Sequence, residues 1–251
     1  MEIILAENHG FCYGVKRAVE MADEAANSEG KSYTLGPIIH NPQVVGRLEN
    51  KGVSPIQEVA DIDEGTMIIR SHGVGPAIYA EAEEKGLHIL DATCPHVKKA
   101  QQDAKSVIED GMTLVILGEK NHPEVKSINL WANNKGIIIE DEESAEKLQI
   151  VEKMGVVVQT TFSQFKFNSI IEILEKKSKN LKIFKTICNA TQERQNSAVD
   201  LARNVDLMIV IGGKNSGNTN RLAEVCRDVG CTTYHIETST ELQLEWFNRV
   251  Q

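Results

Sequence analysis

The sequence has no long hydrophobic run and no excess of positive charge, and each absence excludes a class of protein. The longest purely apolar runs, such as 207–211, are far shorter than the roughly 20 residues that span a bilayer. The run at 1–5 is also too short for the apolar region of a secretory signal, so we expect a cytoplasmic protein. Lysine and arginine number 27 against 36 aspartate and glutamate, and this net charge of −9 repels nucleic acid and anionic membranes. We therefore expect neither as a partner.

The sequence also lacks a Cys-x-x-Cys pair. Its five cysteines are an odd set spread along the chain. In a reducing compartment this pattern argues against a disulfide framework and favours metal-binding or catalytic thiols. With 41% hydrophobic and 25% charged residues, the remaining composition is that of an ordinary globular protein, which excludes disorder and collagen-like repeats.

Three of the cysteines mark an internal repeat. Each of Cys12, Cys94 and Cys188 follows a β-rich run, at 1–5, 88–93 and 182–187, and opens a helix-like run. A second β-rich run that ends in glycine comes next, followed by a polar loop. In these loops one residue stands 28 positions after its cysteine (40 − 12, 122 − 94 and 216 − 188), namely His40, His122 and Ser216. Three equal spacings are hard to obtain by chance, so the chain is a threefold repeat.

A third β-rich run follows in the first two repeats, at 66–72 and 156–161, and ends near His72 and Thr160. Such runs alternate with helix-like runs at 76–85, 163–177 and 221–229, a pattern that predicts βαβ units with parallel strands. The predicted fold class is α/β, with three pseudo-threefold-related modules, each a small, mainly parallel sheet flanked by helices. Their expected extents are 13–94, 95–187, and 188–251 together with 1–12. Because ligand sites lie beyond the carboxyl ends of parallel strands, we expect the modules to converge on one centre.

The third module is expected to be incomplete. Spacing from the first two modules would end its third strand at about 248–254, and the sequence ends at Gln251. We therefore expect its last strand and helix to be missing.

One thiolate per module at the start of a helix suits a metal cluster, because a helix N-terminus favours the anionic form of sulfur. Cys12, Cys94 and Cys188 could hold three irons of a cubane and leave the fourth iron open to substrate. The alternative is three buried structural thiols, which the symmetric placement disfavours. Cys226 and Cys231 lie outside the repeat, and we expect them to pack in the core.

The strand-end residues supply many hydrogen-bond donors and only one carboxylate. The glycine-rich loop 212–218 opens a helix without the Gly-Lys-Ser/Thr ending of a Walker A loop. We interpret the set as an anion cradle of the size of a diphosphate, although each histidine alone could be structural. Its members are His40, His72, His122, Thr160, Ser216 and Asn218.

Glu124 is that single carboxylate. In a buried pocket its pKa would be raised, and it could deliver a proton to a leaving hydroxyl. The alternative is a carboxylate that simply favours a helix N-terminus. The residues alone leave the two open.

Eight motifs in order resemble the hydroxymethylbutenyl diphosphate reductases of the LytB/IspH family, along the whole chain. They are Glu7-Asn-His-Gly-Phe-Cys12-Tyr-Gly-Val-Lys, Gly36-Pro-Ile-Ile-His40-Asn-Pro, Arg70-Ser-His72-Gly, Asp91-Ala-Thr-Cys94-Pro, His122-Pro-Glu124, Gln159-Thr-Thr161, Thr186-Ile-Cys188-Asn-Ala-Thr and Lys214-Asn-Ser-Gly-Asn-Thr-Asn-Arg221.

The resemblance implies an iron–sulfur oxidoreductase of the methylerythritol phosphate route to isoprenoids. It would reductively dehydroxylate 4-hydroxy-3-methylbut-2-enyl diphosphate to isopentenyl and dimethylallyl diphosphates, with the substrate alkoxide on the open iron. It implies a trefoil of three domains around a [4Fe-4S] cluster on Cys12, Cys94 and Cys188. Oxidation would convert this cluster to a [3Fe-4S] form or remove it. Electrons would come from ferredoxin or flavodoxin.

The resemblance also implies residue roles. Glu124, linked through Thr160, would supply the proton, with His122 and Thr160 as further catalytic residues. The allylic diphosphate would be held by His40, His72, His122, Thr160, Ser216 and Asn218. Two departures stand out: Gly217 replaces a serine found in many members, and the family's C-terminal Gly-Ala-Ser-x-Pro segment is absent.

Two other functions would place different residues at these positions. A three-module iron–sulfur enzyme such as quinolinate synthase should show arginine or lysine for carboxylates, and the His/Ser/Asn cradle argues against it. A non-catalytic metal- or anion-binding protein would have no use for Glu124, so Glu124→Gln would leave its ligand affinity intact.

Overall fold

The computed structural model describes residues 2–248 and alternates helices with strands along the chain. The helices are α1 (Tyr13–Ala26), α2 (Pro42–Glu49), α3 (Pro76–Glu84), α4 (Pro95–Glu109), α5 (Pro123–Trp131), α6 (Glu142–Glu146), α7 (Gln164–Glu175), α8 (Asn189–Ala202) and α9 (Gly217–Asp228). The strands are β1 (Ser32–Leu35), β2 (Val53–Ile56), β3 (Thr66–Ile69), β4 (His88–Asp91), β5 (Thr113–Leu117), β6 (Ile137–Ile139), β7 (Val151–Val158), β8 (Ser178–Phe184), β9 (Leu207–Ile211) and β10 (Thr232–Ile236).

The strands form three sheets with a shared topology. Their orders are β2-β1-β3-β4, β6-β5-β7-β8 and β10-β9, and each pairing among the described residues is parallel. In the first two sheets the strand order is second, first, third, fourth, and the third sheet repeats the first two positions. The predicted α/β class with small parallel sheets is confirmed.

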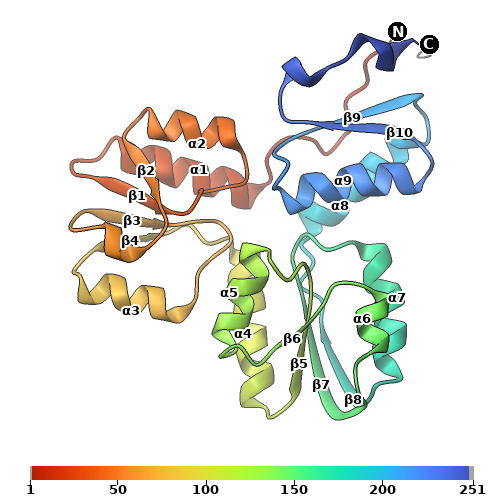
Figure 1. Cartoon of the computed structure of the whole chain (residues 1–251), viewed down its shortest axis with the longest axis horizontal. Coiled ribbons are helices and arrows are strands. Elements are labelled where there is room, and N and C mark those ends of the chain that lie inside the picture. The colour runs from red at the N-terminus through yellow and green to blue at the C-terminus, as the bar shows by residue number, and fades with distance from the viewer. Residues whose placement is uncertain (1, 249–251) are drawn as a thin grey trace. The chain divides into compact units, whose positions relative to one another are not determined.

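Helices cover both faces of the first sheet, with α1 and α2 on one side and α3 on the other (Figure 1). Ala18 of α1 and Leu48 of α2 pack into one buried cluster with Ile68 of β3. Met67, the residue before Ile68 on β3, points to the opposite face of the sheet and packs in a second cluster with Ala82 of α3. Successive strand side chains alternate between faces, so a continuous apolar strand serves two cores.

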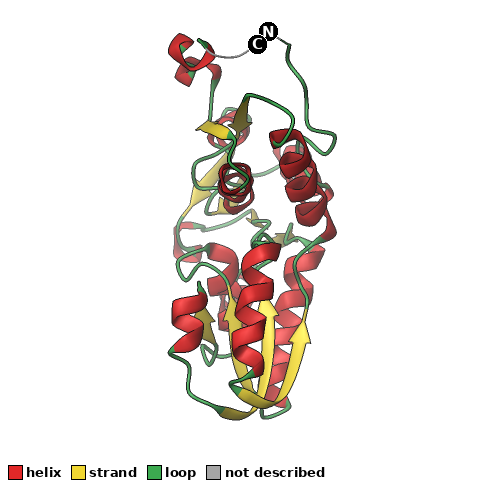
Figure 2. Ribbon diagram, turned by 90° about the vertical axis from the view of Figure 1, so that its right-hand side faces the viewer, coloured by secondary structure: helices red, strands yellow, loops and turns green. Residues whose placement is uncertain are grey.

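The second sheet has the same layered arrangement. Val156 packs with Phe167 of α7 on one face, and Val157 packs with Ala104 of α4 on the other. Its arrows point the same way in the lower part of Figure 2. The carboxyl ends of its strands therefore lie at one edge, as a parallel sheet requires.

The third sheet consists of two strands within residues 2–248. Helices α8 and α9 cover one face, where Met208, Ala198 and Cys226 are buried together. The predicted strand at 1–5 is not formed by its described residues: Ile3 is 79% exposed, and no ladder joins this run to a neighbour. In the first two sheets the fourth strand pairs with the third strand, and the described part of the third sheet has no strand at that third position. Positions 249–251 of the expected third strand lie outside the described residues.

The chain divides into two compact units, which we describe separately. Unit 1 comprises 1–11, 40–42 and 188–251, and unit 2 comprises 12–39 and 43–187. The three-module division at 13–94, 95–187, and 188–251 with 1–12 stays a prediction.

Proline sets where several helices begin. Pro42, Pro76, Pro95 and Pro123 are each the first residue of a helix, where the missing N–H costs nothing and the fixed φ is already helical. Within residues 2–248, no helix combines the length and the apolar character needed to cross a bilayer.

Candidate active site

Each repeat cysteine occupies the N-cap position of a helix. Cys12 precedes α1, Cys94 precedes α4 and Cys188 precedes α8, and all three are half-buried and free of disulfides. The sulfur of Cys188 accepts a hydrogen bond from the Thr191 N–H at 3.3 Å and lies 3.0 Å from the Thr191 hydroxyl. The positive ends of three helix dipoles thus face three thiols, an arrangement that favours thiolates.

Within unit 2, the starts of α1 and α4 meet at Cys94. A Cβ added to Gly14 would lie 2.6 Å from the Cys94 sulfur, so only glycine lets α1 approach this closely. Burial raises the pKa of the Cys94 thiol, although the N–H groups of His96 and Val97 lower it, and the charges of Cys12 and Glu124 raise it further. Cys12 and Glu124 therefore each lie within electrostatic reach of Cys94.

The other two cysteines pack as expected. Cys226 is fully buried between α8 and α9, where burial raises the pKa of its thiol to about 11. Cys231 directly precedes β10 and packs against the same cluster. Neither begins a helix, which separates them from the three repeat cysteines.

Glu124 is a buried carboxyl held by Thr160 within unit 2. The Thr160 N–H donates to one carboxylate oxygen at 2.6 Å, and its hydroxyl donates to the other at 2.8 Å. Burial raises the pKa of Glu124 to about 7, although both hydrogen bonds lower it. A carboxyl with a pKa near 7 can hold a proton at neutral pH, where a glutamate of ordinary pKa would have lost it. The predicted pairing of Glu124 with Thr160 is present, across 36 positions of sequence.

Two predicted histidines also meet in unit 2. His122 is the N-cap of α5, and its Nδ1 accepts from the Glu124 N–H at 3.2 Å. In the neutral ring this leaves the proton on Nε2. His72 follows β3, and its ring meets that of His122 edge to face, with 5.5 Å between centroids.

Unit 1 contains the remaining predicted residues. Gly213 lies against the His40 carbonyl so closely that a Cβ would overlap it, which brings the His40 segment beside the glycine-rich loop. Ser216 is the N-cap of α9, and its hydroxyl accepts from the Thr219 N–H at 3.3 Å. Asn218 is the second residue of that helix. Helix α9 begins earlier than the predicted 221 because Ser216 caps it.

Lys214 lies in the same loop, but its ammonium is engaged elsewhere. It donates to the His235 carbonyl and forms an ion pair with Glu241 at 3.1 Å. The ammonium of Lys214 is therefore already paired within unit 1.

The thiols offer a suitable donor set for a metal group. Iron–sulfur clusters take cysteine thiolates as ligands, and Cys12, Cys94 and Cys188 form no disulfide, are half-buried and cap helix N-termini. The residues present thus fit such a group.

Arg17 and Asp91 were not singled out from the sequence, although they adjoin the loop that ends in Cys94. The one available signal was the basic pair that follows Cys12 and Cys94 at equal offsets, at 16–17 and 98–99.

Comparisons with known proteins extend over the same residues. The sequence profile described as "LytB protein" matches residues 3–251. The 4-hydroxy-3-methylbut-2-enyl diphosphate reductase of Geobacter sulfurreducens is 49% identical over 251 residues, which cover 100% of this chain and 89% of that protein.

Solved structures agree. The E-1-hydroxy-2-methyl-but-2-enyl-4-diphosphate reductase of Plasmodium falciparum superposes with a TM-score of 0.93 at 29% identity and covers 97% of this chain and 79% of its own. A second solved structure, of an (E)-4-hydroxy-3-methyl-but-2-enyl diphosphate reductase, gives a TM-score of 0.70 at 47% identity and covers 99% and 90%. The repeated cysteines, the helix starts that carry them and the match over nearly every residue lead to one conclusion: the chain belongs to the LytB family.

Proposed function

We propose that the chain reduces 4-hydroxy-3-methylbut-2-enyl diphosphate to isopentenyl and dimethylallyl diphosphates, the last step of the methylerythritol phosphate route. The reaction takes up two electrons and two protons, breaks the C–O bond of the allylic alcohol and releases water. Membership of the LytB family and the activity named for its relatives support this proposal. The observation that carries it is a buried carboxyl, Glu124, which Thr160 holds through both oxygens, whose pKa is about 7 and which lies within electrostatic reach of Cys94.

The electrons require a redox group, and the proposal assigns it to Cys12, Cys94 and Cys188. A [4Fe-4S] cluster bound there would accept electrons one at a time from ferredoxin or flavodoxin and pass them to the substrate. The half-buried thiols at three helix starts, none of them in a disulfide, support this assignment. A cytoplasmic location is also proposed, because five cysteines without a disulfide among them suit a reducing compartment.

Glu124 is proposed to protonate the leaving hydroxyl. Hydroxide is a poor leaving group, and a proton placed on its oxygen lets it depart as water. At neutral pH a glutamate of ordinary pKa would be almost fully ionised, whereas a pKa of about 7 leaves about half of the Glu124 carboxyls protonated. Thr160 holds both carboxyl oxygens and would orient the proton.

The diphosphate is assigned to neutral donors and helix N-termini. His72 and His122 in unit 2, and His40, Ser216 and Asn218 in unit 1, are the proposed ligands. His122 and Ser216 are N-caps, where backbone N–H groups and the helix dipole favour an anion. Because its Nδ1 accepts a hydrogen bond, His122 carries its donor on Nε2, the group a phosphate oxygen binds.

A set of substitutions tests the assignment under anaerobic conditions. Cys12→Ser, Cys94→Ser and Cys188→Ser should each lower iron content, whereas Cys226→Ser should retain wild-type iron. Glu124→Gln should retain iron and abolish turnover. Equal iron in all four cysteine variants would refute the ligand assignment, and an active Glu124→Gln would refute the proton donor.

A further inference from the structure

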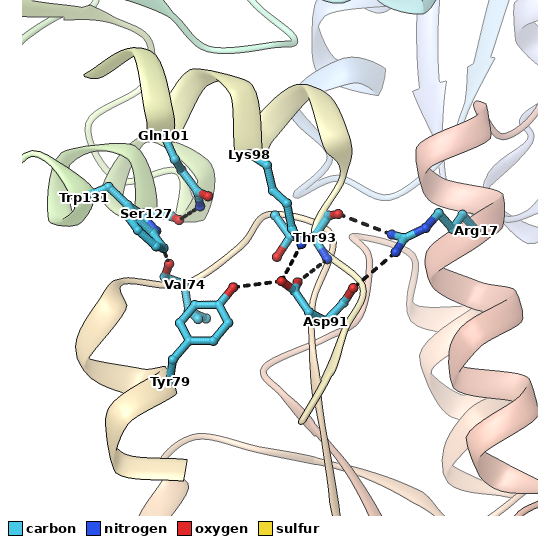
Figure 3. Close-up of polar contacts among 9 residues, drawn as sticks. All are labelled: Arg17, Val74, Tyr79, Asp91, Thr93, Lys98, Gln101, Ser127 and Trp131. Carbon is cyan, nitrogen blue, oxygen red and sulfur yellow. Dashed lines mark hydrogen bonds and ion pairs between the residues drawn. The ribbon is translucent and has the colours of Figure 1, made fainter. Parts of the chain in front are cut away.

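The loop that ends in Cys94 is held from three sides within unit 2 (Figure 3). On one side, Arg17 of α1 donates to two backbone carbonyls of this loop. Its Nη1 reaches the Thr93 oxygen and its Nη2 reaches the Asp91 oxygen, each at 3.3 Å. Arg17 lies five positions after Cys12, on the helix that Cys12 caps. One side chain therefore ties the helix of one cysteine to the backbone beside another.

Asp91 fastens the loop from the other sides. Its carboxylate accepts from the Thr93 N–H at 2.9 Å and from the Tyr79 hydroxyl at 3.1 Å, and it forms an ion pair with Lys98 at 2.6 Å. Lys98 belongs to α4, which Cys94 caps, and Tyr79 belongs to α3. Although burial raises it, Lys98 and Thr93 hold the pKa of Asp91 below its ordinary value, so the carboxylate stays charged.

The contacts span the sequence around Cys94. Thr93 precedes this cysteine, Lys98 follows it by four positions, and the Cys94 N–H itself donates to the Ser71 carbonyl at 3.0 Å. Packing at Gly14 also restricts the position of the Cys94 sulfur. The sulfur lies so close to α1 that a Cβ on residue 14 would overlap it. The loop is thus fixed against α1 by hydrogen bonds and by close packing.

We propose that Arg17 and Asp91 are positioning residues that set where Cys94 presents its sulfur relative to Cys12. This inference depends on the proposed function, because that function assigns both sulfurs to the cluster. Neither side chain is proposed as a ligand or to touch the substrate.

A related contact occurs in unit 1. Arg194 lies on α8, six positions after Cys188, and its guanidinium donates to the Gly10 carbonyl at 3.1 and 3.3 Å. Gly10 is two positions before Cys12. An arginine near the start of one cysteine helix, bound to a carbonyl just before another cysteine, therefore appears twice in the repeat.

The geometry of the guanidinium makes the proposal testable by substitution. The two terminal nitrogens of Arg17 donate to two carbonyls at once, whereas the single ammonium of lysine can replace only part of this pair of hydrogen bonds. Arg17→Met should lose both hydrogen bonds to the loop carbonyls, and Arg17→Lys should retain one of them in part. Arg47→Met is the matched control, because Arg47 also contacts α1, through an ion pair with Asp23 at 2.8 Å, and its side chain is 47% exposed.

Two readouts are measured on the full chain. In the metal-free protein, hydrogen exchange by mass spectrometry should be about tenfold faster in peptides covering 90–95 in Arg17→Met and Asp91→Asn, the equivalent of about 1.4 kcal/mol, and unchanged in Arg47→Met. In the anaerobically reconstituted protein, Arg17→Met should release iron to a chelator about tenfold faster, with an altered electron paramagnetic resonance spectrum. Arg17→Lys should be intermediate in both.

The outcomes separate the two proposals. Wild-type exchange and wild-type iron release in Arg17→Met would overturn the positioning role. Faster exchange with wild-type iron release would also overturn it, because the loop would then be held without consequence for the cluster. A wild-type chain that binds no iron, with faster exchange in Arg17→Met, would refute the proposed function while showing that Arg17 holds the loop.

Discussion

Replacing Glu124 by glutamine should remove a pH dependence of stability that the wild-type chain carries. The pKa of Glu124 is raised from 4.5 to about 7 by burial, so the native state binds this proton more tightly than the unfolded state does. The stabilising contribution is fully present below pH 4.5 and is lost as pH rises through about 7. At 1.36 kcal/mol per pKa unit, the total loss is about 3 kcal/mol.

Glutamine keeps the contacts but not the charge. Its oxygen can accept from the Thr160 N–H, and its amide can donate to the Thr160 hydroxyl. The free energy of unfolding of Glu124→Gln, relative to wild type, should therefore increase by about 2 kcal/mol or more between about pH 5 and about pH 8.5.

Urea unfolding of the metal-free chain measures this difference. Trp131 lies on α5, the same helix as Glu124, and its fluorescence in a Trp246→Phe background reports on unit 2. Groups other than Glu124 contribute equally to both proteins and cancel in the comparison. A stability difference that stays constant across this pH range would refute the raised pKa and, with it, the case for Glu124 as a proton donor.

Three further predictions are each tested by one substitution, and the second of them also has a control variant. Thr160→Val removes a hydrogen bond that lowers the pKa of Glu124, so the high-pH limb of the kcat profile should move to higher pH while kcat falls. Gly14→Ala places a Cβ 2.6 Å from the sulfur of the cysteine that begins α4 and should lower the iron retained after anaerobic reconstitution. Gly46→Ala meets nothing within 4 Å on α2 and is its control, expected to keep wild-type iron. Cys226→Ala should cost about 1 kcal/mol of unfolding free energy in urea titrations and leave iron unchanged, because this thiol is buried in the core.

Much of the fold followed from patterns that are local in sequence. The equal spacing of His40, His122 and Ser216 from their cysteines identified equivalent positions, and the structure places each just before a helix. Proline at the first helical position makes such starts legible from sequence. The strand predicted at 1–5 was wrong for its described residues. Apolar composition alone cannot supply a neighbouring strand, and a strand forms only when it pairs with one.

The contacts that complete the site could not be read this way. Arg17 reaches carbonyls 74 and 76 positions away, which depends on how α1 packs against β4 and its loop. An arginine on a helix also suits a solvated face, so its type carries no signal for this role. The pairing of Glu124 with Thr160 was proposed from family resemblance, whereas the burial that raises its pKa comes only from tertiary packing.

The central claim is best tested by single-turnover chemistry on the whole chain. The protein would be purified and reconstituted without oxygen, its iron and sulfide quantified, and the dithionite-reduced protein mixed with 4-hydroxy-3-methylbut-2-enyl diphosphate. We expect about four irons per chain and the formation of isopentenyl and dimethylallyl diphosphates. A protein that stays colourless and iron-free, or one that holds the cluster and leaves the substrate unchanged, would contradict it.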